Sequence, residues 1–257
     1  MIYILLIYLI ACAVMYLLQR KLLYYPTGKI QHSFPQLKLD NQNESIEVIV
    51  LNEGKNDALL YFGGNAESVI YNAEDFLTSF PIHTVYLLNY RGYGQSTGHP
   101  TEKGIFSDTL LLFDKVQEKH QNISVIGRSL GSGVAVYLAS KRSIHKMALI
   151  TPYDSIKSLG QSKFFIFPVF MLLKDKFDSL SRVKHIKAET IALIAENDEV
   201  IPYNHSHRLI NAFPPGQITA ITIKNSGHND ITEGRKRSTR AHLENMRVLQ
   251  KPRKRAD

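Results

Sequence analysis

The chain has 257 residues, 44% of them hydrophobic, which fits one α/β domain of ordinary size with a full apolar core. Its single cysteine, Cys12, excludes an intrachain disulfide. The formal net charge of +8 favours an anionic partner surface, and the absence of any nucleic-acid motif makes that partner a membrane, with no nucleic acid expected.

The N-terminal segment is uncharged from Ile2 to Leu18, at the short end of the roughly 17–25 residues that span a bilayer. Arg20 and Lys21 follow, and then a pair of tyrosines of the kind found at membrane interfaces. The pattern predicts a single-pass membrane anchor over residues 1–25. A cleaved signal peptide, a lipoprotein signal at Cys12 and a buried core helix remain alternatives. Basic residues after the anchor favour the cytoplasmic side for the domain.

Apolar runs alternate with helical patterns in residues 26–250, which we interpret as one domain. The runs predict strands over 44–51, 58–62, 84–88, 123–126, 147–150, 190–194 and 218–223. Helical spacing predicts helices over 67–79, 105–116, 134–139 and 203–213. This alternation indicates an α/β fold with a mostly parallel central sheet and helices on both faces. Residues 251–257 form a basic tail.

The stretch from about 152 to 187 interrupts the alternation. Strand-to-helix connections usually run about 2–6 residues, so this stretch is predicted to be an insertion. It contains the apolar segment Phe164 to Leu173. Two interpretations are compatible: a helix packed on the sheet, and a short lid whose apolar face covers a pocket or touches lipid.

The pentapeptide from Gly127 to Gly131 follows a predicted strand and precedes a predicted helix. Strand, Gly-x-Ser-x-Gly, helix is typical of a nucleophile elbow, with Ser129 at its apex. The turn is so sharp that side chains two residues to either side of Ser129 would collide with neighbouring backbone, which explains the glycines. The alternative is a glycine-rich loop leading into a helix, so the interpretation depends on suitable partners for Ser129.

A serine nucleophile needs a base, and the base needs a carboxylate that orients it. Asp198 follows the predicted strand 190–194, and His228 follows the last predicted strand. All three residues are expected at carboxyl ends of strands, in an order known for such triads. Asp198 has an alternative role as the cap of the next helix. Its rivals for the acid are Glu196, Glu199 and Asp154.

Two backbone amides are needed to hold the oxyanion of an acyl-transfer reaction. The candidates are the amide of Leu130, directly after the nucleophile, and the amide of Asn65, in a glycine loop after the strand 58–62. No metal and no organic cofactor are expected. His205 and His207 are only two residues apart and lack a third ligand nearby, so they are a weak metal site.

Taken together, these motifs resemble those of α/β-hydrolases, especially the small membrane-anchored serine hydrolases of the branch that contains protein depalmitoylases, lysophospholipid hydrolases and monoglyceride-lipase-like enzymes. The matching segments are residues 23–26, 62–66, 89–96, 127–131, 198–202 and 227–228. The chain departs from this branch at Gly63-Gly64-Asn65, where His-Gly-Asn is usual, and at Ala195-Glu196, where His-Gly is common. The first departure bears on how the oxyanion loop is braced. The segment from Tyr90 to Gly94 is expected to shape the loop behind the site.

The resemblance implies an α/β-hydrolase fold and a Ser-His-Asp hydrolase acting through an acyl-enzyme. The expected substrate is a carboxylic ester or thioester with an apolar acyl chain, because the anchor and the apolar insertion both suit lipid-like molecules. Two rival functions are an aminopeptidase-like amide hydrolase and a catalytically silent, membrane-tethered binding module.

Overall fold

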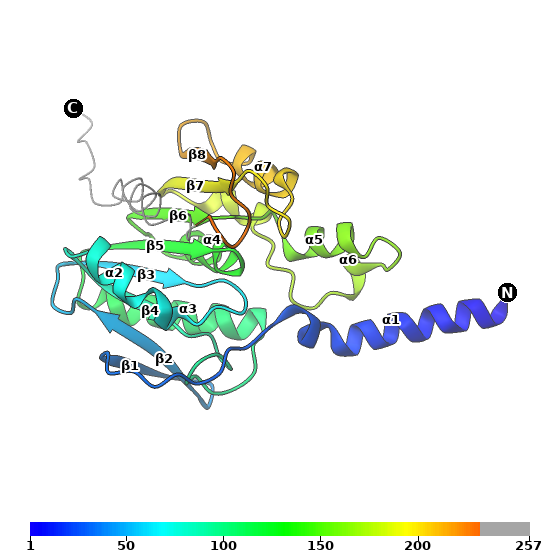
Figure 1. Cartoon of the computed structure of the whole chain (residues 1–257), viewed down its shortest axis with the longest axis horizontal. Helices are drawn as coiled ribbons and strands as arrows, with labels where there is room; N and C mark the ends of the chain where they lie inside the picture. Colours follow the sequence, from blue (N-terminus) through cyan, green and yellow to red (C-terminus); the bar gives the residue numbers. More distant parts are fainter. Residues whose placement is uncertain (232–257) are drawn as a thin grey trace.

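A computed structural model describes residues 1–231, so the predicted basic tail at 251–257 lies outside the described residues. A long N-terminal helix, α1 (Ile2–Leu23), precedes a layered α/β domain (Figure 1). The strands are β1 (Gln36–Asn41), β2 (Glu44–Leu51), β3 (Asp57–Phe62), β4 (His83–Leu88), β5 (Asn122–Arg128), β6 (Lys146–Ile150), β7 (Glu189–Ala195) and β8 (Ile218–Ile223). They form one eight-stranded sheet in the order β1-β2-β4-β3-β5-β6-β7-β8.

The sheet is mostly parallel, as predicted. The strands from β4 to β8 in this order pair in parallel, and β1 and β2 add an antiparallel edge. The register sets Phe62 of β3 opposite Gly127 of β5, so the carboxyl ends of these two strands lie side by side. Parallel strands align their carboxyl ends at one edge, where ligands of such sheets usually bind.

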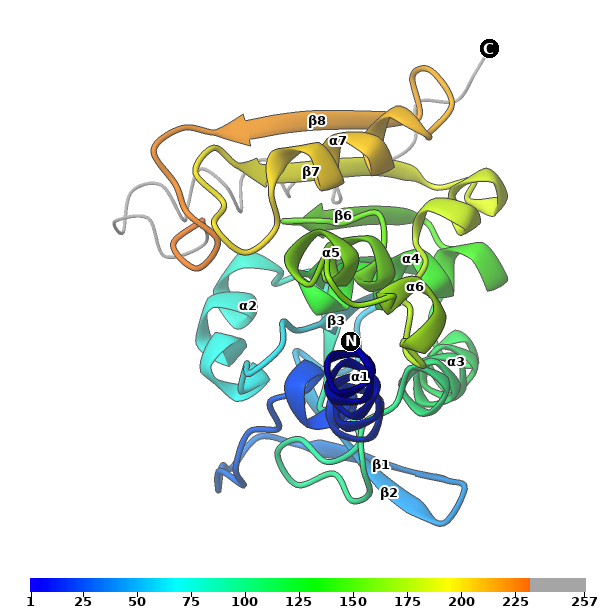
Figure 2. The same cartoon turned by 90° about the vertical axis from the view of Figure 1, so that its right-hand side faces the viewer.

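Helices cover both faces of the sheet (Figure 2). One core packs α3 (Glu102–Gln117) and α4 (Leu130–Lys141) onto the sheet and includes Phe113 and Leu138. The other core lies under α2 (Ala73–Ser79) and includes Phe76 and Phe80. The strands from β2 to β7 read as near-continuous apolar runs because both of their faces are covered, whereas the edge strands β1 and β8 are more exposed.

One strand was not predicted, and several predicted helices differ from the structure; α4, predicted over 134–139, begins at Leu130 and ends at Lys141. Strand β1 was not predicted, because only its two leucines are apolar. The predicted helix over 67–79 is a 3₁₀ turn, η1 (Val69–Asn72), followed by α2. The helix predicted to reach 213 is α7 (Tyr203–Asn211), and the amide of Phe213 closes a tighter turn on the carbonyl of Ile210 just before Pro214.

The insertion contains both short helices and an exposed apolar segment. Its helices are α5 (Ile156–Lys163), α6 (Val169–Leu172) and the 3₁₀ helix η2 (Leu180–His185). Helices α5 and α6 lie beside α1 in both views (Figures 1 and 2). Among residues 1–231, α1 alone is long and apolar enough to cross a membrane, a description that fits an anchor or a signal sequence.

Candidate active site

Ser129 lies at the apex of the turn between β5 and α4, in the strained backbone conformation expected of an elbow. Its φ of 49° and ψ of −116° lie outside the regions that non-glycine residues prefer. Surrounding hydrogen bonds hold this conformation: the Ser129 amide donates to the carbonyl of Ile150 at 2.9 Å, and the Ser132 hydroxyl donates to the carbonyl of Ser129 at 2.7 Å.

The two glycines of the elbow are required by close backbone packing, as the sequence predicted. A Cβ atom at Gly127 would lie 2.3 Å from the carbonyl oxygen of Gly131. A Cβ atom at Gly131 would lie 2.0 Å from the carbonyl oxygen of Phe62, at the end of β3. The start of α4 therefore packs directly on the neighbouring strand, and this contact fixes the position of Ser129.

The structure brings Ser129, Asp198 and His228 together in one hydrogen-bonded row. The Nε2 atom of His228 lies 2.9 Å from the Ser129 hydroxyl oxygen. Its Nδ1 atom lies 2.9 Å from Oδ2 and 3.0 Å from Oδ1 of Asp198. The side chains of His228 and Asp198 are only 7% and 3% exposed, so water competes little for these hydrogen bonds.

The rival acids are engaged elsewhere. Asp154 accepts hydrogen bonds from His205 and Arg208, each at 2.8 Å. Glu196 accepts from the amide of Asn225 at 2.7 Å, and Glu199 reaches only the backbone amide of His228, at 3.4 Å. Within residues 1–231, Asp198 is the carboxylate that forms a hydrogen bond and an ion pair with the His228 ring.

Asp198 does not cap α7, because the residue at that position is Pro202. Its Oδ1 atom accepts from the amides of Val200 and Ile201, at 2.9 and 2.7 Å. The carboxylate thus closes a local turn that aims it at the imidazole.

The loop after β3 runs directly past the nucleophile. A Cβ atom at Gly64 would lie 3.7 Å from the Cβ atom of Ser129. The Gly64 amide itself is occupied, because it donates to Glu67 at 2.7 Å. Within residues 1–231, neither the amide of Asn65 nor the amide of Leu130 donates a hydrogen bond, so neither is committed to another acceptor.

Glu67 braces this loop, a role that the sequence analysis missed. Besides the Gly64 amide, its carboxylate accepts from Tyr61 at 2.5 Å, Asn72 at 2.7 Å and Arg128 at 2.8 Å. Burial, with the Glu67 charge beside it, raises the pKa of Tyr61 well above its usual value, so this phenol stays a donor. The sequence contains one local signal for this role. Glu67 follows Gly64 by three residues, the spacing at which the glutamate of a capping box accepts a hydrogen bond from a backbone amide.

A second brace connects the loop to the segment behind it and to the end of α1. The Tyr90 hydroxyl donates to the carbonyl of Gly63 at 2.8 Å, and the Tyr93 hydroxyl donates to Asn65 Oδ1 at 2.7 Å. These contacts confirm that the 90–94 segment shapes the loop. The side chain of Asn65 also donates to the carbonyl of Leu23 at 2.6 Å and accepts from the amide of Tyr25 at 3.0 Å.

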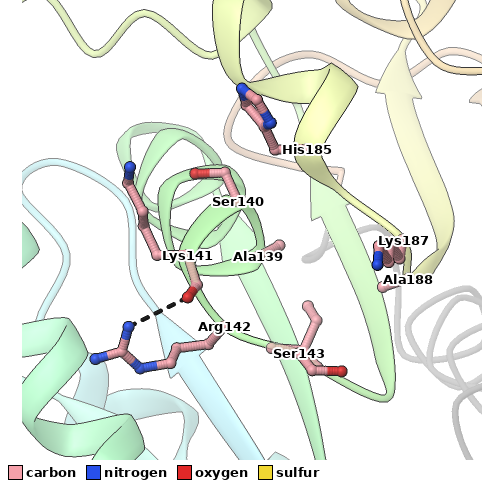
Figure 3. Close-up of a pocket in the computed structure, with 9 residues that line it drawn as sticks. Ala139, Ser140, Lys141, Arg142, Ser143, His185, Lys187 and Ala188 are labelled. Atoms are coloured by element: carbon pink, nitrogen blue, oxygen red, sulfur yellow. Dashed lines mark hydrogen bonds between the residues drawn. The ribbon is translucent and has the colours of Figure 1, made fainter.

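A cavity of about 230 Å³ lies elsewhere on the domain. Figure 3 shows residues that line it. The cavity is lined by residues 139–144, His185, Lys187 and Ala188, at the C-terminal end of α4. Ser129 precedes the other end of this helix, about 18 Å away at about 1.5 Å per residue, so the cavity is separate from the nucleophile.

No group of three or more His, Cys, Asp or Glu side chains in the described part of the chain is placed to hold a metal ion. His205 bonds Asp154, and His207 bonds Tyr203.

The sheet, the elbow and the loop contacts together define an α/β-hydrolase fold. The match of residues 57–170 to the model of the α/β hydrolase fold family agrees with this. Solved structures with the same fold include an esterase of Pyrococcus furiosus, with a TM-score of 0.67 and 16% identity over 88% of this chain and 99% of that one. Another is mouse α/β hydrolase domain-containing protein 10, with a TM-score of 0.65 and 15% identity over 84% of this chain and 100% of that one.

The relatives that sequence comparison finds are only distantly similar to this chain. An uncharacterised protein of Mycobacterium tuberculosis is 29% identical over 192 residues, which cover 71% of this chain and 67% of that protein. The lysophosphatidylserine lipase ABHD12 of Bos taurus is 32% identical over 175 residues, which cover 60% of this chain. The match spans only 43% of that lipase.

Proposed function

We propose that the chain is a serine hydrolase that cleaves carboxylic ester or thioester bonds of apolar acyl substrates. The observation that carries the proposal is the row Asp198–His228–Ser129, with contacts of 2.9 Å on both sides of the imidazole. The lipase and the esterase among the relatives and solved structures support an ester substrate.

The proposed mechanism assigns one step to each contact. His228 Nε2 takes the hydroxyl proton of Ser129 as its oxygen attacks the acyl carbonyl, and the amides of Leu130 and Asn65 bind the resulting oxyanion. Asp198 keeps the Nδ1 proton of His228 in place and stabilises the imidazolium. The same proton then passes to the leaving alcohol or thiol. A water molecule, deprotonated by His228, then attacks the acyl carbonyl of the acyl-enzyme. The bond between this carbonyl carbon and Ser129 Oγ breaks, His228 returns the proton to Ser129, and the carboxylic acid leaves.

The proposed substrate is lipid-like, and the proposed location is the cytoplasmic face of a membrane with α1 as a single-pass anchor. The apolar helix α1 ends at the site loop, because Asn65 bonds both Leu23 and Tyr25. In the proposed arrangement, the Asn65 side chain joins the end of the membrane-embedded helix directly to the loop after β3. An amide substrate has no such support in the described residues.

Labelling of the full-length protein with a fluorophosphonate probe tests the mechanism. We expect the native chain to be labelled and Ser129→Ala to be unlabelled, because the probe reacts only with an activated serine. Ser140→Ala is the matched control: it removes a hydroxyl at the far end of α4 that only donates to the carbonyl of Tyr137. A native chain that stays unlabelled while correctly folded would leave the silent binding module as the better interpretation.

A panel of p-nitrophenyl esters graded by acyl length tests the substrate class. We expect kcat/KM to rise with acyl length from acetate to longer chains, because each buried methylene stabilises the complex by about 0.8 kcal/mol. A preference for acetate that declines steadily with length would contradict an apolar acyl site.

A further inference from the structure

One face of α1 packs against the domain while the rest of the helix is exposed. The partly covered positions include Tyr8, Cys12, Met15, Gln19 and Leu23. Their spacing of three or four residues makes them a continuous stripe on a helix. The insertion between β6 and β7 contacts this stripe at Tyr8 and at Gln19.

The contacts along the stripe are specific. The Tyr8 hydroxyl donates to the carbonyl of Ile166 at 2.9 Å. Near the other end of the helix, Gln19 donates to the carbonyl of Leu172 at 3.2 Å and accepts from the amide of Lys174 at 2.7 Å. The insertion therefore runs beside α1 from Tyr8 to its last turn, where Arg20 pairs with Asp175 at 2.8 Å.

The part of the insertion that lies along α1 is apolar, and several of its side chains are exposed. Residues 164–173 carry no charge and are flanked by Lys163 and Lys174. Phe165 is 76% exposed and Met171 is 71% exposed, and Ile166 and Phe170 are also exposed. An exposed apolar patch of this kind marks an interaction site, and an uncharged segment of about ten residues suits one that enters a membrane without crossing it.

Several polar groups in this segment have partners within the protein. The side chain of Gln161 donates to the carbonyl of Phe167 at 3.1 Å and accepts from the amide of Phe170 at 3.3 Å. Together with the bonds from Tyr8 and Gln19, this removes carbonyls and an amide that would otherwise need water. Non-helical backbone at membrane depth requires such partners.

We propose that residues 164–171 enter the hydrocarbon of the bilayer beside α1, so that lipid acyl chains cover Phe165, Ile166, Phe170 and Met171. Tyr8 lies about 18 Å from Arg20 along the helix axis, at about 1.5 Å per residue. The half-thickness of a bilayer core is about 15 Å. With Arg20 and Lys21 at the headgroups, the contact of Tyr8 with Ile166 lies near the middle of the bilayer.

This inference rests on the proposed anchor and does not depend on hydrolysis. It also deepens the proposed function: the insertion and the end of α1 together hold the site loop at the membrane surface. A substrate acyl chain then reaches the site directly from the lipid.

The chain has no tryptophan, so a single introduced tryptophan reports on its own surroundings. The test uses full-length Phe165→Trp reconstituted in vesicles of phosphatidylcholine, with or without bromine on the acyl chains. We expect brominated lipid to quench the emission of this variant severalfold. Ile82→Trp is the control, because Ile82 is 54% exposed and directly precedes β4, at the amino ends of the parallel strands and away from their carboxyl ends. Its emission should not change.

Leu5→Trp separates the two ways in which the test can fail. Leu5 is 57% exposed on α1 and far from the insertion segment in sequence. Quenching of Leu5→Trp without quenching of Phe165→Trp would overturn the inference while leaving the anchor intact. Absence of quenching in both would overturn the anchor and the inference together, and fluorophosphonate labelling of the same samples would report independently on the hydrolase.

Discussion

At the scale of single residues, the structure separates Asp198 from its nearest rival by their contacts. Asp198 bonds the ring of His228, whereas Asp154 bonds His205 and Arg208. We expect Asp198→Asn to lower kcat by about 10⁴-fold, because an amide no longer holds the imidazole in the tautomer that accepts the serine proton. Steady-state hydrolysis of a p-nitrophenyl ester measures this.

Asp154→Asn is the matched comparison. It should lose stability, by about 1–3 kcal/mol for a broken buried hydrogen bond, and keep a kcat close to that of the native chain. Thermal unfolding of both variants separates the two effects. Equal losses of kcat in the two variants, at equal stability, would mean that Asp198 is not the acid.

The contacts of Glu67 also lead to a specific prediction. Its carboxylate accepts from Gly64, Tyr61, Asn72 and Arg128, and a glutamine cannot accept from all four. We expect Glu67→Gln to reduce the free energy of unfolding by about 1–3 kcal/mol. The loop that presents the Asn65 amide should also shift, lowering kcat by up to about 10²-fold, the smaller of the effects seen for loss of an oxyanion donor.

The exposed Glu74 on α2 supplies the control for this change. Glu74→Gln removes the same charge without touching the loop, so both its stability and its kcat should match the native values. Denaturant unfolding and ester hydrolysis of the two variants provide the comparison. An unaltered kcat in Glu67→Gln would show that the loop does not depend on this brace.

At the scale of elements, the contact between α4 and β3 determines the elbow. A methyl group at Gly131 would lie 2.0 Å from a backbone oxygen that cannot move without displacing β3. We expect Gly131→Ala to destabilise the domain by about 3 kcal/mol or more, at or above the upper end of ordinary overpacking, and to abolish fluorophosphonate labelling. Gly28→Ala is the control, since its Cβ would meet nothing within 4 Å.

Prediction from sequence succeeded where the signal is local and failed where it is not. The elbow glycines, the strand runs and the position of His228 after a glycine are all visible within a few residues. The brace on the Asn65 loop joins Glu67 to Arg128 across 61 positions, and the bond from Asn65 to Leu23 spans 42. Two residues that far apart in the sequence form no periodic pattern, so neither contact could be predicted from the sequence. Strand β1 was not predicted for a related reason. It is a strand because it pairs with β2, and its own apolar content is too low to indicate one.

The alternation of apolar runs also predicted the insertion but not its partner. The segment from Phe164 to Leu173 suited a lid or a packed helix equally. Its actual neighbour is α1, which lies more than 150 positions earlier in the chain, as the bond from Tyr8 to Ile166 shows. A contact between two apolar segments leaves no signature in either one, because the same residues would suit lipid, a pocket or the core.

At the scale of the whole molecule, the charges beside α1 support the proposed cytoplasmic location of the domain. The formal net charge is +8, and Arg20 and Lys21 lie in the last turn of α1. Short basic segments next to a membrane helix stay on the cytoplasmic side. The pairing of Arg20 with Asp175 at 2.8 Å joins that basic turn to the domain, so the proposal places both on the same side.

A single-cysteine chain tests this orientation in intact cells. Cys12→Ser removes the native thiol, and Lys119→Cys, at an exposed position after α3, introduces another. A cytoplasmic domain predicts that a membrane-impermeant maleimide labels this cysteine only after the cells are opened. Labelling of intact cells at the rate seen after lysis would place the domain outside. The fold and the proposed triad would stand in that case. The substrate would then have to come from the outer leaflet, because in the proposed arrangement the insertion beside α1 enters the bilayer from the side that carries the domain.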